Sequence, residues 1–318
     1  MTFPDWSRER VLVTGAGGVL GTALVSELSG GAGVAPDRLF ALHRADCDLL
    51  DTVATKQLLR DINPSLVFHL AGQVSGIQGN ISFAGEAYYK NALINLNVIE
   101  AARGSGARKV VAAGTAAIYP DGLAMPMKER DIRNGAPHGS EAAYASAKLG
   151  MLAQLEAYQK QYGMQFAYLI CTNLFGPNDR FDEEYGHVVP SLISRFHRAV
   201  TSGAKSISIW GDGTPTRDFL YAGDAARAFV AAAERFEGAA NAATGSSVPI
   251  RKLVETIADV SGFQGEIVWD SSKPNGQLVR SYSVERLFSI GWRPATTLRE
   301  GVDMTYQWYS GNQGNIRR

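Results

Sequence analysis

Short apolar runs alternate along this chain with longer segments of helical periodicity. The apolar runs at residues 11–13, 39–42, 66–70, 109–113 and 165–170 are typical of strands buried on both faces. Helical patterns occupy residues 51–61, 88–102 and 141–162. Because strands that alternate with helices form parallel sheets, this order predicts an α/β fold with a Rossmann-like, doubly wound parallel sheet.

The pattern changes after residue 170. Residues 171–216 are rich in loop signals, with a helix predicted at 191–201; a further helix is predicted at 218–236 and a further strand of the large sheet at 241–244. Helix and strand patterns resume from about residue 248. We therefore expect a dinucleotide-binding domain of residues 1–171 plus about 217–246, and a smaller substrate-binding lobe of about 172–216 plus 247–318.

The first apolar run breaks into glycines and then into a helical pattern. Gly15, Gly18 and Gly21 follow it at the spacing of a dinucleotide-binding turn. Glycines there allow a tight turn and a close approach of backbone to a pyrophosphate, whose charge the free N–H groups of the new helix favour. We expect Gly15, Gly18, Val19 and Leu20 to bind the cofactor; the alternative is a turn that only joins strand to helix.

Tyr144 and Lys148 lie four residues apart in a helical segment and therefore share one helix face. A lysine ammonium beside a phenol favours the phenolate, so we expect a lowered pKa for Tyr144 and proton transfer near neutral pH. The hydroxyl of Thr115, at an earlier strand end, would bind the same substrate oxygen. The set suits reduction at a carbonyl carbon, although Tyr144 could be an ordinary helix-face aromatic and Lys148 a solvated charge.

Several ordered motifs resemble one family along nearly the whole chain. The glycine turn with Tyr144 and Lys148 is similar to extended short-chain dehydrogenases/reductases that act on nucleotide sugars. The closer resemblance is to the GDP-L-fucose synthase family, carried by segments 71–77, 172–181, 186–190, 210–220, 273–276, 290–292 and 306–308. This resemblance implies a reductive step at a nucleotide-linked 4-keto-6-deoxysugar.

The chain departs from that family's pattern near the catalytic segment. The family's epimerisation cysteine corresponds to Ala117, whereas its serine corresponds to Thr115 and its histidine to His187. Gln73 and Ser75 replace a lysine and a glycine in the loop near the nicotinamide. The resemblance therefore implies reduction of the keto group, whereas the missing cysteine fits an enzyme that reduces without the double epimerisation. His187 would act as a catalytic residue or would only hydrogen-bond the substrate.

Cofactor choice depends on the end of the second strand. His43 and Arg44 stand where an acid would bind the ribose of NAD, and the guanidinium of Arg44 suits the 2′-phosphate of NADP. We expect NADP; the alternative is that Arg44 is a solvated residue and Asp46 reaches the ribose. The resemblance further implies cofactor contacts from Asp48, Leu49, Leu70, Ala71 and Gly72. Alternatively, the segment 48–51 only supplies an N-cap for the helix that follows.

The resemblance also implies a set of substrate-binding residues, namely Val74, Asn173, Val188, Trp210, Arg217, Lys273 and Arg280. Arginine and lysine suit a diphosphate, but each could instead form a surface ion pair. Trp210 could stack on the base or belong to the core. Asn91, in mid-helix, could hold a water near the site or cap a kink.

Composition excludes several other classes. The chain carries 31 basic and 31 acidic residues, so nothing indicates a nucleic-acid surface or a polybasic membrane patch. It has no signal-peptide pattern and no apolar stretch of membrane-spanning length, and its two cysteines, Cys47 and Cys171, have no metal-ligand spacing. We expect a cytoplasmic protein with two buried, reduced thiols.

Assembly depends on two of the predicted helices. In the related superfamily, the helices that correspond to residues 88–102 and 141–162 form a four-helix dimer interface. Leu149, Met151, Leu152 and Leu155 supply an apolar stripe for a homodimer, or the same stripe packs only on the sheet.

Three functions are compatible with these features. The first is NADPH-dependent reduction of the C4 keto group of a nucleotide-linked 4-keto-6-deoxysugar, with GDP favoured by resemblance. The second is a redox-neutral nucleotide-sugar 4-epimerase that retains NAD, which Arg44 disfavours. The third is a dinucleotide-sensing module without catalysis, which the presence of Thr115, Tyr144 and Lys148 together disfavours. A 4,6-dehydratase is also disfavoured, because Ala116 and Ala117 replace the acidic pair that such enzymes carry.

Overall fold

A six-stranded, fully parallel sheet forms the centre of the computed structural model, which describes residues 4–74, 77–183, 186–273, 277–314 and 316. Its strands in spatial order are β10 (Gly238–Ala242), β5 (Gln165–Cys171), β4 (Lys109–Thr115), β3 (Leu66–His69), β1 (Val11–Thr14) and β2 (Leu39–Leu42). The predicted doubly wound parallel sheet is confirmed. The strand order reverses between β1 and β3, which is where sheets of this kind bind ligands.

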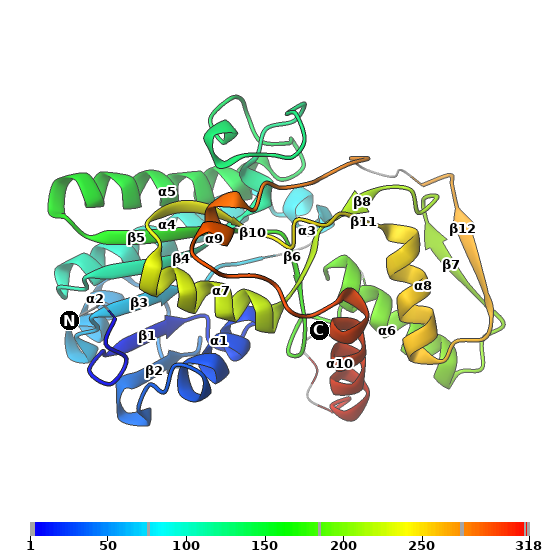
Figure 1. Cartoon of the computed structure of the whole chain (residues 1–318), viewed down its shortest axis with the longest axis horizontal. Coiled ribbons are helices and arrows are strands. Elements are labelled where there is room, and N and C mark those ends of the chain that lie inside the picture. The colour runs from blue at the N-terminus through cyan, green and yellow to red at the C-terminus, as the bar shows by residue number, and fades with distance from the viewer. Residues whose placement is uncertain (1–3, 75–76, 184–185, 274–276, 315, 317–318) are drawn as a thin grey trace.

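Helices cover both faces of this sheet (Figure 1). One face carries α1 (Val19–Gly30) and α7 (Ala222–Arg235), and the other carries α2 (Thr52–Ile62), α4 (Ala84–Gly104) and α5 (Ala142–Tyr162). Alternation along β5 shows why both faces are apolar: Phe166 and Tyr168 pack with the α4–α5 side, whereas Leu169 packs with the α1–α7 side. The short helices are η1 (Pro36–Arg38), α3 (Ile77–Ser82), η2 (Ala116–Ile118) and η3 (Glu129–Asp131).

A second lobe lies beyond the carboxyl ends of the sheet strands (Figure 1). Its helices are α6 (Val188–Thr201), α8 (Ile250–Ser261) and α10 (Leu298–Gly311), which surround a separate hydrophobic cluster that includes Phe196, Leu253 and Val302. Three strand pairs complete this part of the chain: β6 (Asn173–Phe175) with β9 (Phe219–Tyr221), β7 (Ser206–Trp210) with β12 (Glu266–Asp270), and β8 (Thr216–Arg217) with β11 (Val248–Pro249). Helix α9 (Glu285–Ser289) contacts β10 of the main sheet.

Two predicted elements are placed wrongly. The helix expected at residues 218–236 begins only at Ala222, because residues 219–221 pair with β6. Asp218 is fully buried and its carboxylate accepts hydrogen bonds from backbone amides, which the sequence pattern does not reveal. The last strand covers residues 238–242 rather than 241–244, since alanines and a glycine pair there with β5 without a β-branched signal.

The two cysteines differ in exposure. Cys171 is buried at the end of β5, whereas Cys47 is only partly buried, so the expectation of two buried thiols is wrong for Cys47. Within the described part of the chain, no helix is long and apolar enough to span a bilayer. The described residues also contain no group of three or more His, Cys, Asp or Glu side chains that could hold a metal ion.

Candidate active site

The glycine turn connects β1 to the start of α1. Gly15 has a φ of 72°, and a methyl group there would lie 2.8 Å from the backbone nitrogen of Ala71. Gly21 touches the turn's own backbone, with no space for a Cβ. Gly18 is the N-cap of α1 and offers no side-chain cap, so the first N–H groups of α1, which begin with Val19 and Leu20, stay available for an anion.

The end of β2 carries the residues that were expected to select the cofactor. Arg44 and His43 are exposed there. Asp46 is engaged in its own turn, where its carboxylate accepts a 2.7 Å hydrogen bond from the His43 amide. That hydrogen bond directs the Asp46 carboxylate back onto its own turn.

The segment 48–51 supplies the N-cap of helix α2. Asp51 is that N-cap and accepts hydrogen bonds from the amides of Val53 and Ala54, so the N-cap alternative for this segment is confirmed at Asp51. Asp48 is exposed and accepts a 3.1 Å hydrogen bond from the Leu50 amide. Leu49 beside it is buried in the hydrophobic core.

Thr115, Tyr144 and Lys148 come together at the carboxyl end of β4. Tyr144 and Lys148 are 8% and 2% exposed, and the Lys148 ammonium lies 5.9 Å from the centroid of the Tyr144 ring. The Thr115 hydroxyl lies near enough to Tyr144 to lower its pKa, and it accepts a 3.2 Å hydrogen bond from the Ala117 amide. Burial excludes the alternative of a solvated Lys148, and the catalytic role of Tyr144 stays a prediction.

The ionisation of the pair differs from the expectation. Burial raises the pKa of Tyr144 well above its ordinary value, and the Thr115 hydrogen bond opposes this only weakly. Burial also lowers the pKa of Lys148 to about 8. The predicted lowering of the Tyr144 pKa is wrong for the protein alone, because loss of water, helped by the charges of Cys171 and Glu141, outweighs the one lowering influence, that of Thr115. Tyr144 is thus a protonated phenol at neutral pH, which is the form of a proton donor.

The loop after β3 lies between the glycine turn and Lys148. A methyl group at Gly72 would lie 3.6 Å from the Lys148 Nζ and 2.8 Å from the Asn91 Oδ1. Asn91 exchanges two 3.0 Å hydrogen bonds with the backbone of Gln73, so its side chain holds this loop rather than capping a kink. The predicted contacts Leu70, Ala71 and Gly72 line this stretch; Ser75 lies outside the described residues.

Two predicted substrate residues carry positive charge near the start of α5. Arg217 donates to the carbonyl oxygens of Thr216 and Gln277 at 2.8 and 2.7 Å, and Arg280 lies 3.6 Å from the Glu141 carboxylate, three residues before Tyr144. The pKa of Arg217 is lowered by burial and by the charge of Arg280. Two guanidinium groups thus lie close enough in a partly buried position for the charge of one to disfavour ionisation of the other.

The remaining predicted residues lie in the second lobe, except Val74, which belongs to the loop after β3. Trp210 is 69% exposed with the Lys273 ammonium 5.7 Å from its ring centroid, so the core alternative for Trp210 is wrong. His187 is exposed at the N-cap of α6 and makes no capping hydrogen bond through its side chain, and Val188 beside it is half-buried. Val74 is 45% exposed, and Asn173 donates a 2.9 Å hydrogen bond to the Asp218 carbonyl.

Two buried polar residues at the site escaped the sequence analysis. Asp218 accepts four hydrogen bonds, from the amides of Thr244 and Gly245 and from the hydroxyls of Thr172 and Thr244. His69 is fully buried at the end of β3. A polar residue inside an otherwise apolar run of the sequence could have pointed to both residues. Such a side chain is buried with its strand and therefore needs hydrogen-bond partners inside the protein.

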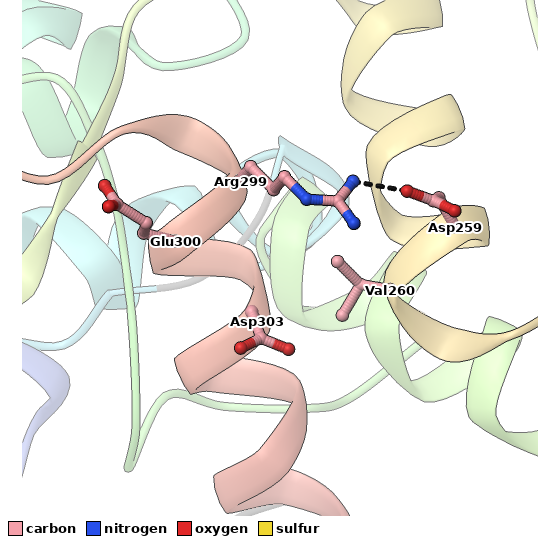
Figure 2. Close-up of a pocket in the computed structure, with 5 residues that line it drawn as sticks. All are labelled: Asp259, Val260, Arg299, Glu300 and Asp303. Atoms are coloured by element: carbon pink, nitrogen blue, oxygen red, sulfur yellow. Dashed lines mark hydrogen bonds and ion pairs between the residues drawn. The ribbon is translucent and has the colours of Figure 1, made fainter.

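A surface pocket lies away from these residues, between α8 and α10. Figure 2 shows its five lining residues, with Arg299 and Asp259 paired across the opening. The pocket measures about 320 Å³ and contains none of the predicted site residues.

Comparisons with known proteins agree with this geometry. Residues 11–243 match the model of the NAD dependent epimerase/dehydratase family. GDP-L-fucose synthase of Escherichia coli (strain K12) is 33% identical over 98% of this chain and 99% of its own length. The predicted resemblance to the GDP-L-fucose synthase family is thereby confirmed.

Solved structures show the same similarity. A GDP-L-fucose synthetase from Naegleria fowleri bound to NADP has a TM-score of 0.89 and 28% identity, and the match covers 98% of this chain and 97% of that one. A GDP-6-OMe-4-keto-L-xylo-heptose reductase from C. jejuni has a TM-score of 0.89 and 25% identity over 95% of this chain and 98% of its own. This chain belongs to the NAD dependent epimerase/dehydratase family.

Proposed function

We propose that this chain is an NADPH-dependent reductase of the C4 keto group of a GDP-linked 4-keto-6-deoxysugar. The observation that carries the proposal is the buried cluster of Thr115, Tyr144 and Lys148 at the carboxyl end of β4, beside the glycine turn. The relatives add support, because they include GDP-L-fucose synthases, one bound to NADP, and a reductase of a GDP-linked keto-heptose.

The residues of the glycine turn and of the end of β2 fit NADPH. Gly15 leaves no room for a side chain at the turn, and the uncapped N-terminus of α1 presents N–H groups to a diphosphate. Arg44 is exposed at the end of β2, where its guanidinium would bind the 2′-phosphate. When bound, NADPH supplies the hydride. Val19 and Leu20 would meet the diphosphate, Asp48 and Leu49 would border the adenosine, and Leu70, Ala71 and Gly72 the nicotinamide side.

Tyr144 is the proposed proton donor. As hydride reaches the C4 carbon, negative charge develops on the carbonyl oxygen, and the protonated Tyr144 hydroxyl donates its proton there. Thr115 hydrogen-bonds the same oxygen and orients Tyr144. Lys148, fixed to the Ala113 carbonyl at 3.0 Å, provides positive charge that stabilises the phenolate left behind.

Substrate binding falls to the lobe beyond the sheet, which would be formed by about 172–216 plus 247–318. Arg217 and Arg280 would bind the diphosphate, and Lys273 would add positive charge at its edge. Trp210, exposed beside Lys273, would stack on the guanine base. Val74, Asn173 and Val188 would border the sugar.

We further propose that reduction proceeds without epimerisation at C3 and C5. The family's epimerisation cysteine corresponds to Ala117, which is buried and 3% exposed and has no ionisable group. His187 remains, exposed at the start of α6, and its proposed role is a hydrogen bond to the sugar. Epimerisation at two carbons needs acid and base chemistry that this segment does not provide.

A homodimer through α4 and α5 is also proposed. The stripe of Met151, Leu152 and Leu155 packs inside the chain, each residue being 3% exposed or less, so it leaves nothing for a partner. The outer face of α4 instead exposes Tyr89 by 62% and Leu96 by 54%.

Leu96→Glu should convert a dimer to a monomer in light scattering. A wild-type monomer at micromolar concentration would reject this interface.

The test of the function is NADPH oxidation on mixing the protein with GDP-4-keto-6-deoxymannose, with NADH as the control cofactor. Consumption of NADPH supports the reductase, and a product made in D₂O without deuterium at C3 or C5 supports reduction without epimerisation. Absence of consumption, together with NAD released when the protein is denatured, would replace the proposal with a redox-neutral 4-epimerase.

A further inference from the structure

A chain of hydrogen bonds crosses the core beneath the proposed active site. The Thr14 hydroxyl lies 2.9 Å from the His69 Nδ1, and the His69 Nε2 lies 3.0 Å from the Asn95 Oδ1. Asn95 in turn donates a 3.3 Å hydrogen bond to the carbonyl of Ala147. The chain thus joins β1, β3, α4 and α5 through side chains that are at most 2% exposed.

The ends of this chain fix the direction of every hydrogen bond in it. The Ala71 amide donates to the Thr14 hydroxyl oxygen at 3.2 Å, and the Leu70 amide is shared at 3.2 Å between that oxygen and the Thr14 carbonyl, so the lone pairs of the hydroxyl face these amides. The Thr14 proton therefore points to the His69 Nδ1, and the His69 Nε2 carries the ring proton. At the other end, a carbonyl can only accept, so the Asn95 amide group faces Ala147 and its oxygen faces His69.

His69 is consequently a neutral imidazole of one defined tautomer. Burial and, to a smaller extent, the nearby charge of Lys148 together lower the pKa of His69 to about 3. A protonated ring would direct a second N–H at a Thr14 oxygen whose lone pairs face the two amides. The neutral form satisfies every polar atom of the ring.

The two ends of this chain of hydrogen bonds lie next to the residues that are proposed to bind the cofactor and to carry out catalysis. Thr14 immediately precedes Gly15, and the two amides that it accepts belong to the loop whose Gly72 lies against Lys148. Ala147 immediately precedes Lys148 on α5. A shift of the His69 ring would therefore move the glycine turn relative to the helix that carries Tyr144.

We propose that His69 is a positioning residue that holds the cofactor turn, the loop after β3 and the catalytic helix in one fixed arrangement. The inference rests on the proposed roles of Tyr144 and Lys148. The competing interpretation is a histidine that only fills the core. The two differ in what they predict: positioning affects turnover and cofactor affinity, whereas core filling affects only stability.

The experiment compares His69→Leu with a matched pair at Thr14. Thr14→Val keeps the shape but removes the hydroxyl, and Thr14→Ser keeps the hydroxyl. Lys109→Met is the control, because Lys109 is buried at the opposite end of β4 and its ammonium donates hydrogen bonds to carbonyls at the end of α7. We expect kcat to fall about tenfold in His69→Leu and Thr14→Val, with the KM for the sugar within about twofold of wild type, and Thr14→Ser to stay near wild type.

Two further readouts need no sugar. The Kd for NADPH should rise severalfold in Thr14→Val and His69→Leu but not in Thr14→Ser or Lys109→Met. The ¹⁵N spectrum of the His69 imidazole at neutral pH, assigned by its loss in His69→Leu, should show a bare Nδ1 and a protonated Nε2. A wild-type protein that binds NADPH but does not turn over the keto-sugar would count against the proposed substrate, and these two readouts would still decide the role of His69.

Three results would overturn the positioning role. The first is a Thr14→Val variant with unchanged kcat and NADPH affinity. The second is a His69→Leu variant that loses thermal stability as Lys109→Met does but keeps its kinetic constants. The third is an imidazole protonated at Nδ1.

Discussion

The ammonium of Lys148 donates a 3.0 Å hydrogen bond to the carbonyl oxygen of Ala113, two residues before Thr115 on β4. This bond fixes α5 to the carboxyl end of the strand beside it. It also holds the lysine within reach of the Tyr144 ring, which lies one helical turn earlier. The charge of this one buried side chain is therefore central to the chemistry that we propose.

The pH dependence of kcat/KM for NADPH should report Lys148. Burial lowers its pKa to about 8, so the ammonium is present below pH 8 and is lost as the pH rises through that value. We expect kcat/KM to be flat from pH 6.5 to 7.5 and to fall toward tenfold per pH unit above 8. Tyr144 cannot cause this decline, since burial raises its pKa. An unchanged decline in Lys148→Arg would contradict the assignment.

Removal of the Tyr144 hydroxyl should abolish most of the activity. Tyr144→Phe deletes the proposed proton donor, so kcat should fall by about 10² or more, while the Kd for NADPH changes less than about threefold. Steady-state assays and a fluorescence titration of NADPH measure the two effects. Ser146→Ala, an exposed change on the same helix, is the control. Turnover of Tyr144→Phe within twofold of wild type would refute the catalytic role.

Reversal of the charge at the end of β2 should change the cofactor preference. Arg44→Glu places a carboxylate where the 2′-phosphate is proposed to bind, so kcat/KM for NADPH should fall by about tenfold to 100-fold. The value for NADH should stay level or rise. Arg60→Glu, exposed at the end of α2, makes the same charge change elsewhere and should alter neither. An equal loss of kcat/KM with NADPH and with NADH would mean that Arg44 does not bind the 2′-phosphate.

The buried carboxylate of Asp218 should matter for stability and for sugar binding. Asp218→Asn replaces one accepting oxygen by a donor that faces other donors, which should cost about 2–4 kcal/mol of unfolding free energy. Because Arg217 is its neighbour and Asn173 binds its carbonyl, the KM for the sugar should rise more than the KM for NADPH. Chemical denaturation and kinetics test this, with the exposed change Asp37→Asn as control.

The buried ammonium of Lys109 should contribute to stability alone. It donates hydrogen bonds of 2.8 to 2.9 Å to the carbonyls of Ala232, Ala233 and Phe236 at the end of α7. Lys109→Met leaves these carbonyls without a donor and should lower the unfolding free energy by about 3 kcal/mol. The kcat measured well below the melting temperature should remain unchanged. A melting temperature equal to wild type would show that these hydrogen bonds add nothing.

Strands and helices could be predicted from the sequence wherever a single hydrophobic pattern dominated the segment. The runs at 11–13 and 165–170 are apolar and bounded by turn or helix signals, so periodicity located them within a residue or two. The helix at 218–236 failed because Asp218 and the strand after it depend on partners remote in sequence, at residues 172–175 and 244–245. A local pattern carries no information on such pairing.

The sequence by itself determined the glycine turn, the one-turn spacing of Tyr144 and Lys148, and the alternation of strands and helices, because these depend on neighbours a few residues apart. Only the tertiary structure decided the exposure of Trp210, the hydrogen bonds of Asn91 and His69, and the direction of the Tyr144 pKa shift. The physical reason is that desolvation and hydrogen-bond partners are set by every segment that packs around a side chain, and those segments are distant in sequence.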